Sequence, residues 1–486
     1  MMVVKRESRK LAVPLFLLLL SALFAASPAS AQYTPMILES NAAQSNYGWA
    51  VAPAGDVNQD GYADLLVGAP GYTDGQAKEG SAFLYLGGPP NFPLGGPPTD
   101  PPAPAWMYQS NQAGAAFGAS VAPAGDVNGD GFPDVIIGAP GYDNGEVNEG
   151  RAYIFLGGPY GLNAEPFWIN EGNQDGACYG ASVASSVPFG LSTVPNVFIP
   201  NPVKSFNNDA YADIVVAAPG YDNGQIDEGR VFVYHGGPSG PAVWPSWIFE
   251  SDQEGARLGA SVAPAGWLTT SRQTSLIIGA PYFDSTAPEQ GRAYLFLGTD
   301  SGLASAPAWT KDGDGEFAFF GETVGTAGDV NGDGIWDLLV GAWSYINPDN
   351  QDEILGRTYL FLGIPEGAQQ DPQWMHGAFQ SDSHYGFAVT TAGFSGTDVF
   401  WDVAVAEPMH DVEKGRIQVF YGDTEPLLGP AWDQEGDQPD ALFGYALSTA
   451  GDLNGDGRFD LAVGAPAYSN GQDKEGAVYL YFMSGS

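Results

Sequence analysis

Four segments of the chain place oxygen-bearing side chains at a spacing that suits a bound metal ion. Each reads Asp-x-Asn-x-Asp-Gly-x-x-Asp. Alternating oxygen donors around a tight glycine turn favour a hard cation that takes six to eight oxygen ligands at about 2.3–2.6 Å. This flexible cage suits calcium better than magnesium, which needs stricter geometry. The predicted side-chain ligands are Asp56, Asn58, Asp60, Asp64; Asp126, Asn128, Asp130, Asp134; Asp329, Asn331, Asp333, Asp337; and Asp452, Asn454, Asp456, Asp460.

The residue after each glycine can add its backbone carbonyl, so Tyr62, Phe132, Ile335 and Arg458 complete the predicted ligand sets. These segments are not EF-hands, because the twelfth position holds Val or Ile where an EF-hand has a bidentate Glu. The alternative is an acidic turn stabilised by its own Asx hydrogen bonds. Four copies in one register favour the metal, since crowded carboxylates need a counter-ion. We therefore predict four calcium sites, with a fifth left open.

Three further segments occupy equivalent positions with altered ligands. The third repeat keeps Asn207, Asp209 and Asp213 but has Ser205 first and Ala210 in place of the glycine, so a fifth calcium site there is an open alternative. The fourth repeat has Trp267, Thr269, Ser271 and Ser275 at the ligand positions. The sixth retains only Asp398 and Asp402. We expect no metal in the fourth and sixth repeats.

The acidic segments belong to a repeat that fills the chain. An aromatic-Gly step, replaced by Leu258-Gly259 in the fourth copy, opens each unit at Gly48, Gly118, Gly180, Gly259, Gly321, Gly386 and Gly444. Three short apolar runs and a Trp-bearing run follow, which predicts four short strands per unit. The last unit lacks its Trp run, and Met36-Ile37-Leu38 supplies the missing strand. The sequence predicts an all-β, seven-bladed β-propeller of four-stranded blades over residues 32–486, closed by an N-terminal strand.

The order Phe/Tyr-Gly, acidic loop, Gly-Ala-Pro resembles the FG-GAP repeat of integrin α-subunit propellers and of many exported bacterial proteins. The resemblance covers residues 36–483. It implies calcium in the acidic loops and a role in extracellular adhesion or partner recognition. It is limited to the propeller: the sequence shows neither integrin leg domains nor the catalytic domain of the GPI-specific phospholipase D family.

One position between the second and third strands is aromatic or His in every unit. It comprises Tyr72, Tyr142, Tyr221, Phe283, Tyr345, His410 and Tyr468. These rings could surround the channel mouth and bind a partner; the resemblance implies that integrin propellers hold a partner's basic side chain with aromatic rings on this face. The alternative is that each ring caps its own hairpin.

The N-terminus has the order of a secretory signal. A basic stretch from Lys5 to Lys10 precedes the apolar run from Leu11 to Ala26 and the small-residue end Ala29-Ser30-Ala31. We predict a cleaved signal peptide over residues 1–31 and a protein that is secreted, periplasmic or attached to the cell surface. No later run approaches about 20 apolar residues, so no membrane span follows. The formal net charge of −40 disfavours nucleic acid as a partner.

Catalytic motifs are missing from the sequence. The four His show no metalloprotease spacing, and no nucleophile elbow or phosphate-binding glycine loop occurs. The lone Cys178 has no role that the sequence assigns. We predict an exported, calcium-binding, non-enzymatic module that binds a protein or glycan at the cell surface. Two alternatives are a polysaccharide hydrolase or lyase with paired carboxylates, and a scaffold component that binds copies of itself.

Overall fold

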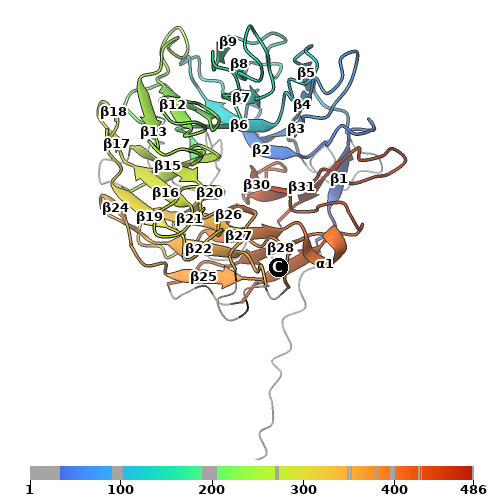
Figure 1. The fold of residues 1–486 in the computed structure, drawn as a ribbon. Helices are drawn as coiled ribbons and strands as arrows, with labels where there is room; N and C mark the ends of the chain where they lie inside the picture. The colour runs from blue at the N-terminus through green and yellow to red at the C-terminus, as the bar shows by residue number, and fades with distance from the viewer. Residues whose placement is uncertain are drawn as a thin grey trace, which may run out of the picture.

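Seven antiparallel four-stranded sheets surround a central axis as the blades of a propeller (Figure 1). The structure is a computed structural model that describes residues 33–89, 102–188, 205–268, 273–346, 350, 353–378, 380–394, 400–424, 427 and 429–483. The predicted signal peptide lies outside these residues. Within the described part of the chain, no helix has the length and apolar character needed to cross a bilayer.

The strands follow the predicted order. Blades one to three contain β2 (Ala50–Gly55), β3 (Asp64–Ala69), β4 (Ser81–Tyr85) and β5 (Trp106–Gln109); β6 (Ser120–Gly125), β7 (Asp134–Ala139), β8 (Arg151–Phe155) and β9 (Trp168–Glu171); and β10 (Ser182–Ser185), β11 (Ile214–Ala218), β12 (Arg230–Tyr234) and β13 (Trp247–Glu250). Blades four and five contain β14 (Ser261–Trp267), β15 (Thr274–Ala280), β16 (Arg292–Phe296) and β19 (Trp309–Asp312); and β20 (Thr323–Gly328), β21 (Asp337–Ala342), β22 (Arg357–Phe361) and β25 (Trp374–Gly377).

Blade six contains β26 (Ala388–Gly393), β27 (Asp402–Glu407), β28 (Arg416–Phe420) and β29 (Trp432–Glu435). Two short hairpins, β17 (Gly298–Thr299) with β18 (Gly302–Leu303) and β23 (Gly363–Ile364) with β24 (Gly367–Ala368), extend blades four and five, and α1 (His410–Glu413) lies in blade six. Each blade buries one face of its sheet against each neighbour, which explains why second strands such as Asp134–Ala139 are buried along their whole length.

The last blade is completed from the other end of the chain. It contains β30 (Ala446–Gly451), β31 (Asp460–Ala465) and β32 (Ala477–Tyr481), and β1 (Met36–Glu39) is its outermost strand. Met36 pairs with Leu480 and Glu39 with Ala477 in an antiparallel register. Figure 1 shows β1, from the start of the described chain, in the same blade as β30 and β31. The seven four-stranded blades and their closure by the N-terminal strand are confirmed.

The Gly-Ala-Pro and aromatic-Gly motifs meet between neighbouring blades. A Cβ built on Gly68 would lie 2.0 Å from the carbonyl oxygen of Gly118 in the next blade, and Gly118 itself has a φ of +85°. Both positions therefore favour glycine, one for close approach and one for its left-handed backbone. The ring of the adjacent Phe117 is fully buried in the core between these blades. The glycines and aromatic rings of the repeat motif are therefore residues through which one blade contacts the next.

The innermost strands of all seven blades line a cavity of about 190 Å³ on the ring axis. Its described lining is apolar with a few hydroxyl groups, including Ser185, Thr326, Thr390 and Ser448. The channel ends at two opposite faces of the ring. The loop face carries the connections between first and second strands, which include the acidic segments. The opposite face, called here the aromatic face, carries the connections between second and third strands and the entry into each first strand.

Candidate metal centres and the aromatic face

The four acidic loops share one hydrogen-bonded conformation. In the first loop, the carboxylate of Asp56 accepts the backbone N–H groups of Asp60 at 3.0 Å and Gly61 at 2.9 Å. The Asn58 amide donates to Asp60 Oδ2 at 2.9 Å. The same glycine N–H bond to the first Asp occurs in the other three loops, at 3.0, 2.8 and 2.8 Å. The predicted ligands of each loop therefore lie around a single turn.

The ninth residue of each loop anchors it to the blade. Asp64 is fully buried, and its two carboxylate oxygens accept the N–H groups of Val57 at 2.8 Å and Gly87 at 2.9 Å. Burial, reinforced by neighbouring carboxylates, raises the pKa of Asp134 and of Asp337 to about 8. The same causes raise the pKa of Asp64 and Asp460 well above the usual range. A bound cation would offset both the burial and the repulsion.

The donor set fits a hard divalent cation, since each loop offers three carboxylates, an amide oxygen and a backbone carbonyl. In the structure these carboxylates face backbone N–H groups. Among the described residues they do not form a group of three within 4.8 Å of one another. A calcium ion held by all three carboxylates of a loop would therefore require them to move closer together.

The raised carboxyl pKa values predict how calcium-free protein responds to pH. An unfolded Asp titrates near pKa 3.9, whereas folded Asp134 and Asp337 titrate near 8. Between about pH 4 and pH 8 the folded state binds the extra protons, so stability falls as pH rises through this window. We expect the melting temperature of metal-free protein to drop from pH 5 to pH 8, with a smaller drop in calcium. A D134N variant should show a shallower slope, and a pH-independent melt in metal-free buffer would contradict this account.

The loop of the third blade keeps the turn but loses one carboxylate. Ser205 Oγ accepts the N–H of Asp209 at 2.9 Å, as Asp56 accepts that of Asp60, and Asn207 donates to Asp209 at 2.8 Å. Asp213 is buried like its counterparts, and burial raises its pKa to about 7. The third loop therefore keeps the turn and the buried Asp of the other four, and a fifth site there stays a prediction.

Aromatic packing replaces the first ligand in the fourth and sixth blades. The Trp267 ring lies 5.5 Å from that of Trp336, and the Phe394 ring lies 4.8 Å from that of Trp401. Ser275 and Asp402 occupy the buried ninth position. Thr269, Ser271 and Asp398 lie outside the described residues. An apolar ring at the first ligand position cannot contribute an oxygen donor.

The loops also connect neighbouring blades through their backbone. The carbonyl oxygen of Asp126 accepts the N–H of Ala212 in the next blade at 2.9 Å, and Asp452 accepts that of Ala63 across the ring closure at 3.0 Å. Asp329 and Trp401 make the equivalent bond at 3.2 Å. The first residue of a predicted metal site is thus part of the interface between two blades.

The seven repeated rings on the aromatic face pack on their own blades. Guanidinium groups cover four of them: Arg151 lies 3.6 Å from the ring centre of Tyr142, and Arg230, Arg292 and Arg357 lie 3.9, 4.0 and 3.6 Å from Tyr221, Phe283 and Tyr345. Tyr72 and Tyr468 contact the cores beneath them, and the His410 ring lies 3.7 Å from Glu407 and 3.5 Å from Glu435 of its own blade. The contacts agree with the capping alternative, and a partner-binding role for this set stays a prediction.

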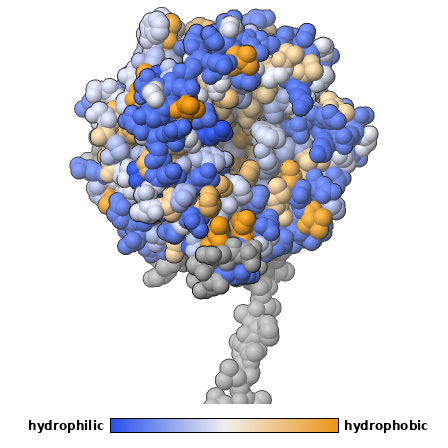
Figure 2. Space-filling view, viewed as in Figure 1, coloured by the Kyte–Doolittle hydropathy of each residue, from blue (hydrophilic) through white to orange (hydrophobic). Residues whose placement is uncertain are grey.

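A different set of rings lies where the first strands of the blades begin and, at Tyr282 and Trp343, where second strands end. These rings form a continuous series from blade to blade, which we call the aromatic arc: Tyr282, Phe319, Trp343, His384, Phe387, Tyr445 and Trp49. The centroid distances between successive rings are 5.0, 5.4, 4.3, 6.5, 5.0 and 4.5 Å. Figure 2 shows the hollow at the centre of the ring of blades. The arc was not predicted from the sequence.

A positional signal for the arc exists in the repeats. The residue after the aromatic-Gly step is Trp49, Phe387 or Tyr445 in three blades, but Ala in blades two to four. Glu322 occupies this position in blade five, and its Oε2 is buried without a hydrogen-bond partner among the described residues. Burial raises the pKa of Glu322, although Arg257 opposes the rise. Burial and the Glu322 charge raise the pKa of Tyr445 to about 12. The rim therefore combines π faces with a carboxyl group.

Comparison with known proteins supports the repeat assignment. The FG-GAP repeat family matches residues 47–85, 117–155 and 443–481, which lie in blades one, two and seven. The chain is 32% identical to integrin α-5 of Xenopus laevis over 195 residues, covering 39% of the chain and 16% of the relative. It is 27% identical to phosphatidylinositol-glycan-specific phospholipase D of Homo sapiens over 407 residues, covering 73% and 44%. The aligned parts span less than half of either relative.

Proposed function

We propose that this chain, an integrin-α-like propeller built from FG-GAP repeats, is an exported calcium-binding module that holds a protein or glycan ligand without turning it over. One observation carries the proposal: four acidic loops of one conformation lie on one face, each tied to its blade by a buried Asp. Burying a carboxylate costs free energy, and this cost occurs in all four loops. Its repetition favours a stabilising ion in each loop over four unrelated turns.

Calcium would supply charge compensation and rigidity at the loop face. The residues that would hold it in the second blade are Asp126, Asn128, Asp130 and Asp134, with the Phe132 carbonyl. Because Asp126 also bonds to the next blade, an ordered loop would strengthen the interface between blades. The metal is therefore assigned a structural role in this proposal.

The aromatic arc is the surface we propose for the ligand. Ring faces attract a cationic group, with about 0.5–2 kcal/mol for each well-placed ring. The Glu322 carboxyl and the net charge of −40 add attraction for a basic partner. A protein ligand that presents a Lys or Arg side chain fits this chemistry best.

The arc predicts a specific loss of binding. We expect a W49A/Y445A variant to lose at least roughly tenfold in affinity for a ligand found on an array of extracellular proteins and glycans, since about 1.4 kcal/mol is tenfold. Tyr160 is 98% exposed on the loop face, so Y160A is the matched control and should bind normally. Titration by surface plasmon resonance in calcium measures both. Equal affinity in the wild type, W49A/Y445A and Y160A would exclude the arc as the ligand-binding surface.

The hydrolase alternative has one supporting observation, the raised pKa of Glu322 at the rim of the channel. An inverting or retaining glycosidase needs a second carboxyl group about 5–9.5 Å away. The described lining of the axial cavity contains no carboxylate. Release of new reducing ends from a glycan panel, abolished in E322Q, would replace the binding proposal with this one.

A further inference from the structure

Three carboxylates converge at the edge of blade three, on the aromatic face. Oxygen atoms of Glu228, Glu250 and Asp252 all lie within 4.8 Å of one another. Glu250 ends the outermost strand β13, and Glu228 lies two residues before β12. The acidic calcium loops are at the other end of the strands, so this cluster is separate from them.

Glu228 is buried with an unused oxygen. Its side chain has no solvent exposure, and its Oε1 accepts the backbone N–H of Asn223. Its Oε2 has no hydrogen-bond partner among the described residues. A buried carboxylate oxygen without a partner is costly, and proximity to two further carboxylates adds repulsion. The cluster therefore needs positive charge.

One guanidinium supplies part of that charge. Arg230 forms an ion pair with Glu250 and stacks on the ring of Tyr221 at 3.9 Å. It does not reach the unused oxygen of Glu228, which is without a hydrogen-bond partner among the described residues. Three carboxylates and one guanidinium leave a formal charge of −2. A divalent cation would neutralise this remainder.

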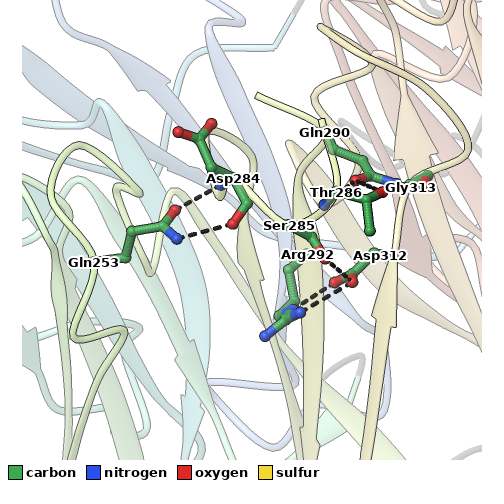
Figure 3. Close-up of polar contacts among 8 residues, drawn as sticks. All are labelled: Gln253, Asp284, Ser285, Thr286, Gln290, Arg292, Asp312 and Gly313. Carbon is green, nitrogen blue, oxygen red and sulfur yellow. Dashed lines mark hydrogen bonds and ion pairs between the residues drawn. The ribbon is translucent and has the colours of Figure 1, made fainter. Parts of the chain in front are cut away.

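A buried Glu with one unused oxygen recurs at the first of the three positions in blades one, two and seven, as Glu79, Glu149 and Glu475, so the convergence of three carboxylates is what distinguishes blade three among the described residues. In blade four, Gln290 replaces the buried Glu and its amide donates to the Gly313 carbonyl, while Arg292 and Ser285 bond Asp312 (Figure 3). In blade six, Lys414 stands at the Glu228 position. In blade two, the third position is Asn173. Among the described residues, three convergent carboxylates occur in blade three only.

We propose that Glu228, Glu250 and Asp252 bind a divalent cation of the calcium class, at a site distinct from the acidic loops. The three side chains offer up to six oxygen atoms, and water completes the shell of an ion that takes six to eight. Glu250 and Asp252 are partly exposed, which leaves the ion a path from solvent.

The site would order the junction between blades three and four. Gln253 follows Asp252 directly, and its side-chain amide bonds the backbone of Asp284 in the next blade, accepting its N–H at 2.6 Å and donating to its carbonyl at 2.9 Å (Figure 3). An ion that fixes Asp252 therefore also fixes the start of this bridge. Arg257 lies on the same segment, and its guanidinium is 5.7 Å from the ring centre of Tyr282 in the aromatic arc.

Ion counting tests the proposal with matched variants. Equilibrium dialysis with radioactive calcium should show one ion fewer per chain in D252N than in the wild type. Asp252 is exposed, so this substitution preserves the fold, and it reproduces the blade-two arrangement. The reciprocal variant N173D should add one ion, because it creates three carboxylates in blade two. E228Q, which copies the amide that blade four has at Gln290, should behave like D252N.

Crystals grown with calcium locate the ion directly by its anomalous scattering. The proposal requires a peak among Glu228, Glu250 and Asp252 in the wild type that disappears in D252N, while any peaks at the acidic loops persist. Identical ion counts in the wild type and D252N, with no peak at the cluster, overturn it. If the acidic loops alone were found to bind no calcium, the result at the cluster would not change. The two proposed kinds of metal site are therefore tested independently.

Discussion

Removal of calcium is expected to lower the melting temperature of this propeller by roughly 10 °C. Each site saturated at 100 times its dissociation constant adds about 2.7 kcal/mol, so four acidic loops add about 11 kcal/mol. Unfolding entropy of about 2.1 cal/mol/K per residue over some 450 residues converts this into a shift of roughly 10 °C. Differential scanning calorimetry in excess calcium and after chelation measures the difference.

Substitutions at equivalent strand positions in two blades distinguish an effect on metal binding from an effect on folding. Asp337 and Asp402 are both fully buried at the first residue of a second strand, but Phe394 removes the first ligand from the loop of Asp402. D337N should reduce the part of the calcium-dependent shift that comes from the acidic loops by about a quarter, since it removes one of four loop sites. D402N should lower both melts equally. Identical melting temperatures of the wild type with calcium and with chelator would show that the loops are turns stabilised by their own hydrogen bonds, without metal.

Truncation of one buried side chain in the closing strand is expected to cost about as much stability as the loss of one calcium site. Leu38 is 1% exposed in the core between the last and first blades, so L38A should cost about 2–5 kcal/mol. Ile37 points to the other side of the strand and is half-buried, which makes I37A the milder control. Urea unfolding followed by circular dichroism gives both free energies.

Deletion of residues 33–40 should do more than either substitution. It exposes the edge of β32, whose backbone groups pair with β1 from Met36 to Glu39. An unpaired edge recruits strands from other molecules, so we expect dimers or larger aggregates on size-exclusion chromatography. A monomeric deletion variant with unchanged stability would show that the ring does not depend on its N-terminal strand.

The sequence predicted the fold because every blade repeats the contacts that define it. The glycines at positions such as Gly68 and Gly118 are visible in the sequence, and the structure shows that they touch. The strand missing after β32 and the extra strand at Met36 likewise implied closure, which the register confirms. Features that recur in each copy are therefore readable from one chain.

The aromatic arc was not predicted because it depends on where blades lie around the ring. Trp49 and Tyr445 are nearly 400 residues apart in the sequence, yet their ring centroids lie 4.5 Å apart once the ring closes. The repeated rings such as Tyr142 are visible in the sequence because they recur, and their recurrence reflects a role within each blade, since Arg151 stacks on the Tyr142 ring. Residues that differ between copies, such as Glu322 and Asp252, carry the chemistry specific to single blades.

Closure by the N-terminal strand also sets an order of events during folding. Met36 pairs with Leu480, which is synthesised 444 residues later. At about 5–20 residues per second, translation separates the two by roughly 20 to 90 s. Local hairpins within each blade can form during this interval, but the pairing of β1 with β32 cannot. The first strand therefore waits as an unpaired segment, and ring closure is a late, long-range step whose rate sets the period of exposure to aggregation.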